Sequence, residues 1–309
     1  MREHVVTVPS KRRDAIVASL RDLPPASEQT IEEKRALIEG TSSHHLDELG
    51  IRRNDVVLDG VGAEWLLVPD RSHDAVVVFL HGGGYIACSV ASHRDRAGRI
   101  AAAAGCDGLI VEYRLAPEHP YPAAIEDSTA VCRAVQASGR PVVLAGDSAG
   151  GGLAVATMVA LRDAGDALPL AAVCISPWVD LTLSAPSLET RRAADPFAHL
   201  DDLPACVDAY LAGADPSQPL ASPLFADLTG LPPLLIQVGS DETMYDDATR
   251  LAQRAAAAGV PVVLEEWMDM FHTWHAYAGA LEAADAAIAH AGTFLARHAG
   301  AADRRSQQA

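Results

Sequence analysis

From residue 76 onward, short runs of continuous apolar residues alternate with longer segments in which apolar residues recur at helical spacing. A strand that is buried on both faces shows continuous apolarity, whereas a strand with one face in water alternates apolar and polar residues. The runs therefore predict a mostly parallel sheet that is covered by helices on both faces. We expect its strands at residues 76–80, 109–113, 142–145, 171–175, 234–238 and 262–265.

The longer segments between these runs have the spacing and the boundary residues of helices. Strand and helix therefore alternate along the chain, which is the pattern of a doubly wound α/β fold. A hairpin is expected just before the first buried strand, because a turn at Gly60 to Gly62 separates two short apolar runs. We expect helices at residues 93–104, 123–138, 151–164, 246–258 and 276–298.

Two segments break this alternation, residues 10–50 and residues 181–222. Neither contains a strand-like run, and a Pro-Pro pair interrupts the first. We expect both segments to form a helical cap over the carboxyl edge of the sheet. The helices expected in them are 11–23, 31–49 and 201–211. The predicted organisation is an N-terminal part of the cap at 1–54, an α/β core made of 55–180 and 223–309, and a cap insertion at 181–222.

The composition indicates a cytoplasmic globular protein. The chain has 309 residues, of which 49% are hydrophobic, enough for a large core. Its apolar runs stay well short of the roughly 18 residues that a membrane-spanning helix needs. The first residues show no apolar segment before a small-residue cleavage site, so we expect no signal peptide. Five scattered cysteines without a CxxC spacing predict reduced thiols in the cytoplasm.

The charge and the histidine spacing narrow the range of partners. A formal net charge of −17 disfavours nucleic acid and anionic membranes, and its even spread along the chain indicates solubility. The 12 histidines show no H-E-x-x-H or comparable ligand spacing, which disfavours a metal-dependent hydrolase. We therefore expect no nucleic-acid partner, no membrane partner, no metal and no cofactor.

A candidate nucleophile lies in the Gly-Asp-Ser-Ala-Gly sequence at residues 146–150, between a predicted strand and a predicted helix. This is the G-x-S-x-G pattern of a nucleophile elbow, in which a tight strand-to-helix turn presents a serine, here Ser148. The glycines two positions away leave room for the backbone to pass close to itself. The alternative is a phosphate-binding turn, but the sequence lacks the lysine of a P-loop and the G-x-G-x-x-G spacing.

A second glycine-rich segment, His-Gly-Gly-Gly-Tyr at residues 81–85, follows the strand expected at 76–80. Acyl transfer passes through an oxyanion, which needs backbone N–H donors that side chains do not screen. Loops of this HGGG type supply such donors to a nucleophile elbow. We expect the donors to be the backbone N–H groups of Gly83, Gly84 and Ala149.

The acid that would orient a catalytic histidine is expected after the strand at 234–238. In chains with this elbow, the order is serine, then aspartate or glutamate, then histidine. The acid has to precede the next helix, which leaves Asp241 and Glu242 as alternatives. Two further carboxylates, Asp246 and Asp247, are expected in the first turn of that helix, where negative charge is favourable.

The base is expected on the loop that follows the last strand, at 262–265. His272 lies on this loop, whereas His275 is expected to begin the last helix, so His272 is the better candidate. His81 precedes the serine, which is the wrong order for a base, and we expect it to anchor its own loop. The acid would hold the imidazole in the orientation that lets it take the proton of Ser148.

Four motifs in this order give the chain a family resemblance. It resembles the hormone-sensitive-lipase-like branch of the α/β hydrolases, often called bacterial family IV esterases, over residues 74–275. The part from Ser222 to Asp247 is particularly similar to monoterpene ε-lactone hydrolases and acetyl hydrolases. The motifs that carry the resemblance are residues 81–85, 113–124, 146–151 and 176–182.

The resemblance implies an α/β-hydrolase fold with a helical cap, and it favours one acid. The family pattern G-x-x-D-P-L-x-D, counted from Gly239, puts the acid at Glu242, although the Asp-Pro pair is missing here. The resemblance also implies a homodimer through the edge strand near Val262. The residues expected to hold the loop beneath the site are Arg114, Glu118 and Asp127.

These observations predict a cofactor-independent serine carboxylesterase that hydrolyses short-chain acyl esters through an acyl-enzyme. The predicted catalytic residues are Ser148, Glu242 and His272. A lactone hydrolase would use the same residues on cyclic esters. A non-catalytic ligand receptor is a further alternative, but such receptors have lost the triad that this sequence retains.

Overall fold

The computed structural model describes residues 2–5, 10–23, 29–41, 46–197 and 202–306. These residues form one nine-stranded sheet in the order β1-β9-β8-β7-β6-β4-β5-β3-β2. Strand β3 pairs antiparallel with β2 and with β5, and the other neighbours are parallel. The strands are β1 (Arg2–Val5), β2 (Arg52–Leu58), β3 (Val61–Leu67), β4 (Val76–Leu80), β5 (Asp107–Glu112), β6 (Val142–Asp147), β7 (Ala172–Ile175), β8 (Leu234–Gly239) and β9 (Val262–Trp267).

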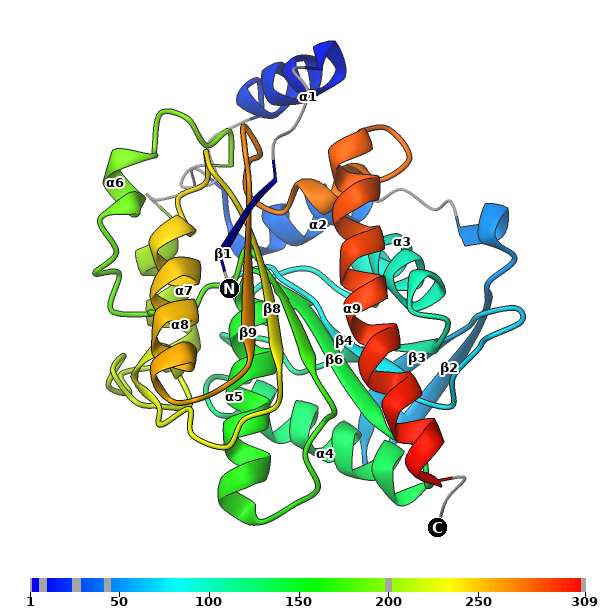
Figure 1. The fold of residues 1–309 in the computed structure, drawn as a ribbon. Coiled ribbons are helices and arrows are strands. Elements are labelled where there is room, and N and C mark those ends of the chain that lie inside the picture. The colour runs from blue at the N-terminus through cyan, green and yellow to red at the C-terminus, as the bar shows by residue number, and fades with distance from the viewer. Residues whose placement is uncertain (1, 6–9, 24–28, 42–45, 198–201, 307–309) are drawn as a thin grey trace.

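Every residue of β4, β6, β7 and β8 is buried, which explains their continuous apolarity. Helices α3 (Val90–Ala103) and α9 (Glu282–Ser306) cover one face of the sheet. Helices α4 (Ala123–Ala137), α5 (Ala149–Ala164) and α8 (Tyr245–Ala257) cover the other (Figure 1). Successive residues of each central strand enter opposite core layers, so the predicted α/β architecture is confirmed.

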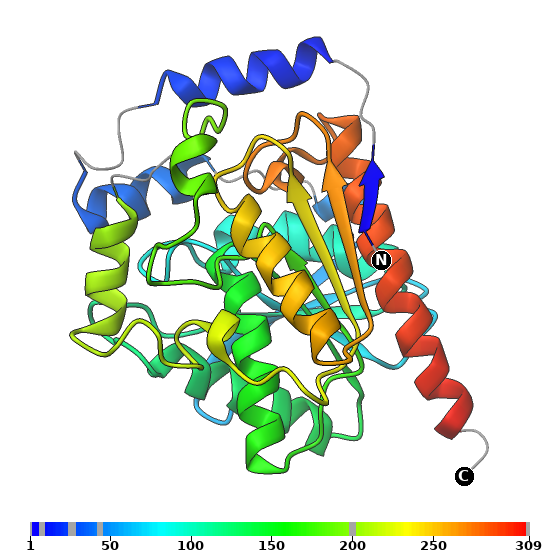
Figure 2. The same ribbon diagram turned by 60° about the vertical axis from the view of Figure 1, so that its left-hand side comes forward.

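The remaining helices lie in the segments expected to form the cap or in short connections. Figure 2 shows α1 beyond the carboxyl ends of β8 and β9, the edge at which the candidate site residues lie. Arg21 of α1 donates to the carbonyl of Ala193 at 3.2 Å, which brings the two expected cap segments into contact. These elements are α1 (Lys11–Arg21), α2 (Ile31–Thr41), η2 (Leu46–Leu49), α6 (Ser187–Thr190), α7 (Leu203–Leu211), η3 (Pro223–Phe225) and η4 (Trp274–Tyr277).

The N-terminal strand β1 is a departure from the expected organisation, in which residues 1–54 are helical. It pairs in parallel with β9, from Arg2 opposite Leu264 to Val5 opposite Trp267. Four residues of mixed polarity give no apolar run, so the pattern could not indicate this strand. The strand near Val262 was expected at the edge of the sheet, and this expectation is wrong, because β1 pairs along most of β9 and is itself the edge strand. The homodimer itself stays a prediction.

Smaller differences concern helix ends. Helix α9 begins at Glu282 rather than near residue 276, because the preceding chain forms η4 and a turn at Gly279, whose φ is +83°. The helix expected at 31–49 is present as α2 and η2, with residues 42–45 outside the described part. No helix among the described residues has the length and apolarity needed to cross a membrane. The five cysteines are free thiols, as expected.

The contact between α9 and α3 depends on Gly292. A Cβ at this position would lie 2.3 Å from the Cβ of Ala103 and 2.5 Å from its carbonyl carbon. We expect Gly292→Ala to reduce the free energy of unfolding by about 1–3 kcal/mol, because overpacking outweighs the gain in helix propensity. Urea denaturation measures this loss. Thr293→Ala, at an exposed position of the same helix, should change the value by less than about 0.5 kcal/mol. A Gly292→Ala protein as stable as the parent would contradict the tight contact.

Candidate active site

The turn between β6 and α5 holds Ser148 in a strained conformation, with φ 54° and ψ −123°. Its neighbours leave no room for side chains. A Cβ at Gly150 would lie 2.0 Å from the carbonyl oxygen of Leu80, and one at Gly146 would lie 2.3 Å from the carbonyl oxygen of Gly150. Such strain persists only where the surroundings enforce it, and it is typical of functional sites. The structure therefore has the nucleophile elbow that the sequence predicts.

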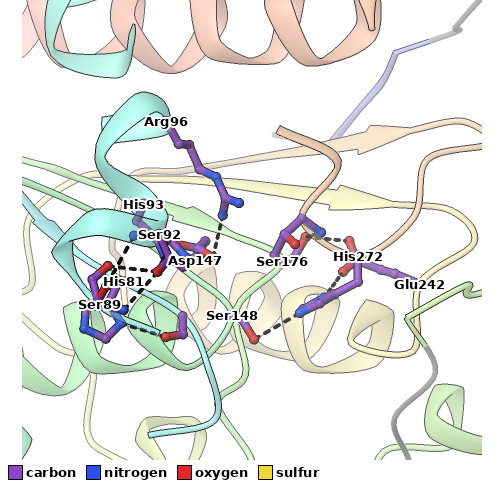
Figure 3. A network of polar contacts seen from close by, with 12 residues as sticks. His81, Ser89, Ser92, His93, Arg96, Asp147, Ser148, Ser176, Glu242 and His272 are labelled. Carbon is purple, nitrogen blue, oxygen red and sulfur yellow. Dashed lines mark hydrogen bonds and ion pairs between the residues drawn. The ribbon is translucent and has the colours of Figure 1, made fainter. Parts of the chain in front are cut away.

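The three predicted catalytic side chains lie together at the carboxyl edge of the sheet (Figure 3). His272 Nε2 is 3.0 Å from Ser148 Oγ, and His272 Nδ1 is 2.8 Å from Glu242 Oε2. They come from the loops after β6, β8 and β9, whose carboxyl ends meet at one edge because the strands are parallel. This chain of hydrogen bonds can pass a proton from the hydroxyl to the imidazole.

The electrostatics of the pair favour a basic imidazole. Burial lowers the pKa of His272, but the hydrogen bond and the charge of Glu242 raise it by more, so its pKa lies above the ordinary value of 6.5. Glu242 is fully buried and also accepts hydrogen bonds from Ser176 Oγ at 3.0 Å and from the backbone N–H of Gly239. These donors offset part of the cost of burying the carboxylate, and burial still raises the pKa of Glu242 above its ordinary value.

Ser176 is a further residue of the candidate site that the sequence pattern did not assign. Its hydroxyl donates to Glu242 and accepts the backbone N–H of Thr273 at 3.1 Å, next to the base. It therefore joins the acid to the loop that carries His272. Its φ of +45° is unusual for a residue other than glycine. The only signal was its place in the motif at 176–182, because its partners are 66 and 97 positions away.

The HGGG loop packs directly on the elbow. A Cβ at Gly82 would lie 2.7 Å from Asp147 Oδ2 and 3.2 Å from the Cβ of Ser148. Gly83 has φ +107°, and a Cβ there would lie 2.2 Å from the carbonyl oxygen of Ala87. Gly84, with φ +62°, faces Cys206 of α7. The glycine that packs on the serine is thus Gly82, and the two glycines expected to donate N–H groups follow it in conformations that disfavour side chains.

A buried polar cluster lies on the other side of Ser148 from His272 (Figure 3). Arg96 Nη1 is 2.6 Å and His93 Nε2 is 3.3 Å from Asp147 Oδ2. Burial raises the pKa of Asp147, but the charge of Arg96 and the interaction with His93 lower it by more, so it stays below its usual range. The residue next to the nucleophile is thereby fixed as an anion, which ties the elbow to α3.

His81 takes no part in the contacts of Ser148 that the structure describes. Its ring is fully buried, stacks on Tyr113 at a centroid distance of 4.2 Å, and places Nδ1 2.8 Å from the carbonyl of Gly82. Tyr113 also donates its hydroxyl to the carbonyl of His81 at 2.6 Å. Burial lowers the pKa of His81 to about 3, so it stays neutral at physiological pH. These contacts agree with the expected anchoring role.

The competing carboxylates point elsewhere. Asp241 Oδ2 lies 2.7 Å from Arg13 Nη2 on α1, away from the imidazole. Asp246 accepts the backbone N–H of Ser187 at 2.8 Å, and Asp247 accepts that of Val179 at 2.8 Å. Of the two alternatives that the sequence left open, Glu242 is therefore the one beside the histidine.

The other late histidine candidate is also engaged elsewhere. His275 lies in η4 rather than at the start of the last helix, and its Nε2 is 2.9 Å from Gln237 Oε1. Its ring is fully buried, and burial holds its pKa well below the ordinary value. His275 therefore joins the end of this loop to Gln237 of β8, and of the two histidines it is His272 that reaches the serine hydroxyl.

The residues expected to hold the loop beneath the site use two separate contacts. Arg114 Nε is 3.0 Å from Asp127 Oδ1, so these two residues form one contact. Glu118 instead binds Arg35 of α2, with Oε1 2.7 Å from Nη1. Arg35 Nε also donates to the carbonyl of Ile86 at 2.8 Å, in the segment after the HGGG loop. The N-terminal segment therefore supports this loop, which the sequence pattern did not indicate.

Comparisons with known proteins agree with this geometry. A family model described as the alpha/beta hydrolase fold matches residues 77–276. An acetyl-hydrolase of Streptomyces hygroscopicus is 48% identical over 267 residues, which cover 85% of this chain and 89% of that protein. Carboxylesterase NlhH of Mycobacterium tuberculosis is 35% identical over 256 residues, which cover 77% of this chain and 80% of that protein.

Solved structures extend the likeness to nearly the whole fold. A crystal structure of EstE5 soaked with p-nitrophenyl butyrate superposes with a TM-score of 0.91 at 39% identity, covering 94% of this chain and 100% of that one. An esterase from the bacterial hormone-sensitive lipase family superposes with a TM-score of 0.89 at 42% identity, covering 94% and 99%. The fold and the resemblance expected from the motifs are thus confirmed. The chain belongs to the α/β-hydrolase family and, within it, to the hormone-sensitive-lipase-like esterases.

Proposed function

We propose that the protein is a serine carboxylesterase that hydrolyses short-chain acyl esters through an acyl-enzyme intermediate. The observation that carries this proposal is the continuous hydrogen-bonded series from Glu242 through His272 to Ser148. A nucleophile, a base within 3.0 Å and a buried acid that orients the base are the parts that acyl transfer requires.

The reaction proceeds in two halves. His272 Nε2 takes the proton of Ser148 Oγ, which attacks the acyl carbon, and the backbone N–H groups of Gly83, Gly84 and Ala149 hold the oxyanion. The intermediate collapses, the C–O bond of the ester breaks, and His272 gives its proton to the departing alcohol. Water then gives a proton to His272 and attacks the acyl-enzyme, and His272 returns this proton to Ser148 Oγ as the acyl–Oγ bond breaks and the acid leaves. The steps balance with water as the only co-substrate.

Two kinds of observation support a preference for short acyl chains, the names of similar proteins and the packing of side chains near the site. One relative is named an acetyl-hydrolase, and a similar structure was soaked with p-nitrophenyl butyrate. Cys206 of α7 packs against Gly84, and the ring of Phe197 lies edge-on to His272 at a centroid distance of 6.5 Å. Both side chains belong to the proposed cap insertion, and both narrow the space around the reacting atoms.

Three further expectations from the sequence form part of this proposal. They are a cytoplasmic location, a cap made of residues 1–54 and 181–222 over a core at 55–180 and 223–309, and assembly as a homodimer. The contact of α1 with Ala193 supports treating the two cap segments as one unit. Sedimentation equilibrium of the purified protein decides between monomer and dimer.

Ser148→Ala is expected to reduce kcat for p-nitrophenyl butyrate by on the order of 100,000- to 1,000,000-fold, because no other group replaces the nucleophile. The parent protein should also be labelled by a fluorophosphonate at one residue per chain, which mass spectrometry places at Ser148. Ser217→Ala, at an exposed loop serine, is the matched control and should keep full activity. Unchanged hydrolysis by Ser148→Ala would contradict the mechanism, and a parent that neither hydrolyses nor labels would support a ligand receptor.

Glu242→Gln is expected to reduce kcat by on the order of 1,000- to 10,000-fold. A carboxylate accepts the hydrogen bond from His272 Nδ1 and so holds the imidazole in the tautomer that can take the serine proton, whereas an amide does not hold it in this way. The pH profile of kcat/KM should change as well. In the parent, activity falls as pH drops through the pKa of His272, above 6.5. Without the carboxylate that raises this pKa, the midpoint should move to lower pH. Glu189→Gln, at an exposed position, should leave rate and midpoint unchanged. A parent-like Glu242→Gln profile would exclude Glu242 as the acid.

A graded series of p-nitrophenyl esters and lactones tests the substrate class. We expect kcat/KM to be highest for acetate or butyrate and to fall more than about tenfold by decanoate, because a longer chain meets the side chains that narrow the site. The hydrolysis rates are followed by release of p-nitrophenol or, for lactones, by pH-stat titration. Faster turnover of an ε-lactone than of every linear ester would favour the lactone hydrolase instead.

A further inference from the structure

Arg13 on α1 contacts both loops that carry the acid and the base. Its Nη2 is 2.7 Å from Asp241 Oδ2, on the loop after β8. Its Nε donates to the backbone carbonyl of Asp269 at 2.9 Å, on the loop after β9. A third nitrogen, Nη1, lies 3.4 Å from the exposed Asp14. The side chains of Arg13 and Asp241 are 20% and 25% exposed, so this pair is only partly open to solvent.

The same contacts close into a ring through Ser240. Ser240 Oγ donates to Asp241 Oδ1 at 3.0 Å, and it accepts the backbone N–H of Asp269 at 2.8 Å. The carbonyl of Asp269 then accepts from Arg13 Nε, which completes the circuit. Each member of the ring therefore forms hydrogen bonds with two others. The planar guanidinium of Arg13 can direct separate N–H groups at a carboxylate and at a carbonyl, which suits this role better than a lysine ammonium.

The ring lies where the two loops already touch through their backbones. A Cβ at Gly239 would be 2.2 Å from the carbonyl oxygen of Met270, and the backbone N–H of Asp241 donates to the same carbonyl at 3.0 Å. Asp269 has φ +60°, a conformation that an aspartate adopts at a cost. Glu242 follows Asp241 directly, and His272 lies three residues after Asp269. A movement of this ring would therefore displace both Glu242 and His272, the two residues whose hydrogen bond joins the acid to the base.

We propose that Arg13 and Asp241 are positioning residues, which hold the acid loop and the base loop at the separation that catalysis needs. The inference rests on the proposed esterase function, and it gives the carboxylate next to the acid a role of its own. It also makes α1 part of the catalytic assembly, because the guanidinium that joins the two loops comes from that helix. Neither residue touches the reacting atoms, so both act through Glu242 and His272.

The test compares Arg13→Met, Asp241→Asn and the double variant with the parent. Misplacement of catalytic groups by a fraction of an ångström to 1 Å costs on the order of 10- to 100-fold in rate. We expect each single variant to lose about this factor in kcat for p-nitrophenyl butyrate, with KM within twofold of the parent. The double variant should be no slower than the slower single variant, because both changes break the same ring.

Arg21→Met is the matched control, because it makes the same change on the same helix. Among the described residues, Arg21 donates to the carbonyls of Ala193 and Ala194, and these two residues lie outside both loops. We expect this variant to keep kcat within twofold of the parent. If Arg21→Met loses as much kcat as Arg13→Met, the effect comes from docking of the helix and the proposal is wrong. Unchanged kcat in Arg13→Met, or additive losses in the double variant, would also overturn it.

Hydrogen exchange gives a readout that does not depend on activity. Peptides that cover residues 267–273 should exchange faster in Arg13→Met and Asp241→Asn than in the parent and in Arg21→Met, while peptides from β6 and β7 exchange as before. Equal exchange of this loop in all four proteins would refute the ring. A parent without esterase activity would overturn the proposed function instead, and the exchange of the base loop would then still decide whether the ring holds it.

Discussion

The site depends on one close approach, the crossing of the elbow backbone over the carboxyl end of β4. Gly150 passes the carbonyl of Leu80 so closely that even a methyl group would lie 2.0 Å from that oxygen. This approach forces Ser148 into its strained conformation and brings the HGGG loop, which continues directly from β4, against the elbow. The close backbone approach of Gly150 to Leu80 thus positions both Ser148 and the HGGG loop, and it does so without a contribution from the side chains of the site.

Hydrogen bonds between loops complete what the backbone crossing begins. Ser176 joins Glu242 to the loop of His272, and Asp195, in the segment between β7 and β8, accepts the backbone N–H of Thr243, the residue after Glu242, at 2.8 Å. Ser187 donates its hydroxyl to the carbonyl of Thr243 at 2.6 Å. The segment around α6 is therefore hydrogen-bonded to the loop after β8, next to Glu242.

Local patterns account for what could be predicted. The buried strands follow from continuous apolar runs, and the elbow and HGGG loop follow from glycines that satisfy a steric need within a few residues. The acid could not be chosen from the residues alone, because Asp241 and Glu242 differ by the direction of a side chain. That direction is set by remote groups, among them Arg13, which is 228 positions from Asp241. Ser176 and β1 were missed for the same reason, since their partners are distant in sequence and their own composition is unremarkable.

The pairing of β1 with β9 has a consequence for the order of assembly. Chains are synthesised from the N-terminus, and early domains fold as they emerge. Here β1 has its partner at Leu264 to Trp267, far along the sequence from β1 itself. This strand can therefore pair only after a long stretch of the chain that follows it has been made. Long-range contacts of this kind are slow to form, because a long loop has to close before they repay its entropy. A nascent chain that has not yet produced β9 lacks the docking site for β1, so this edge of the sheet stays open until residues 262–267 have been synthesised.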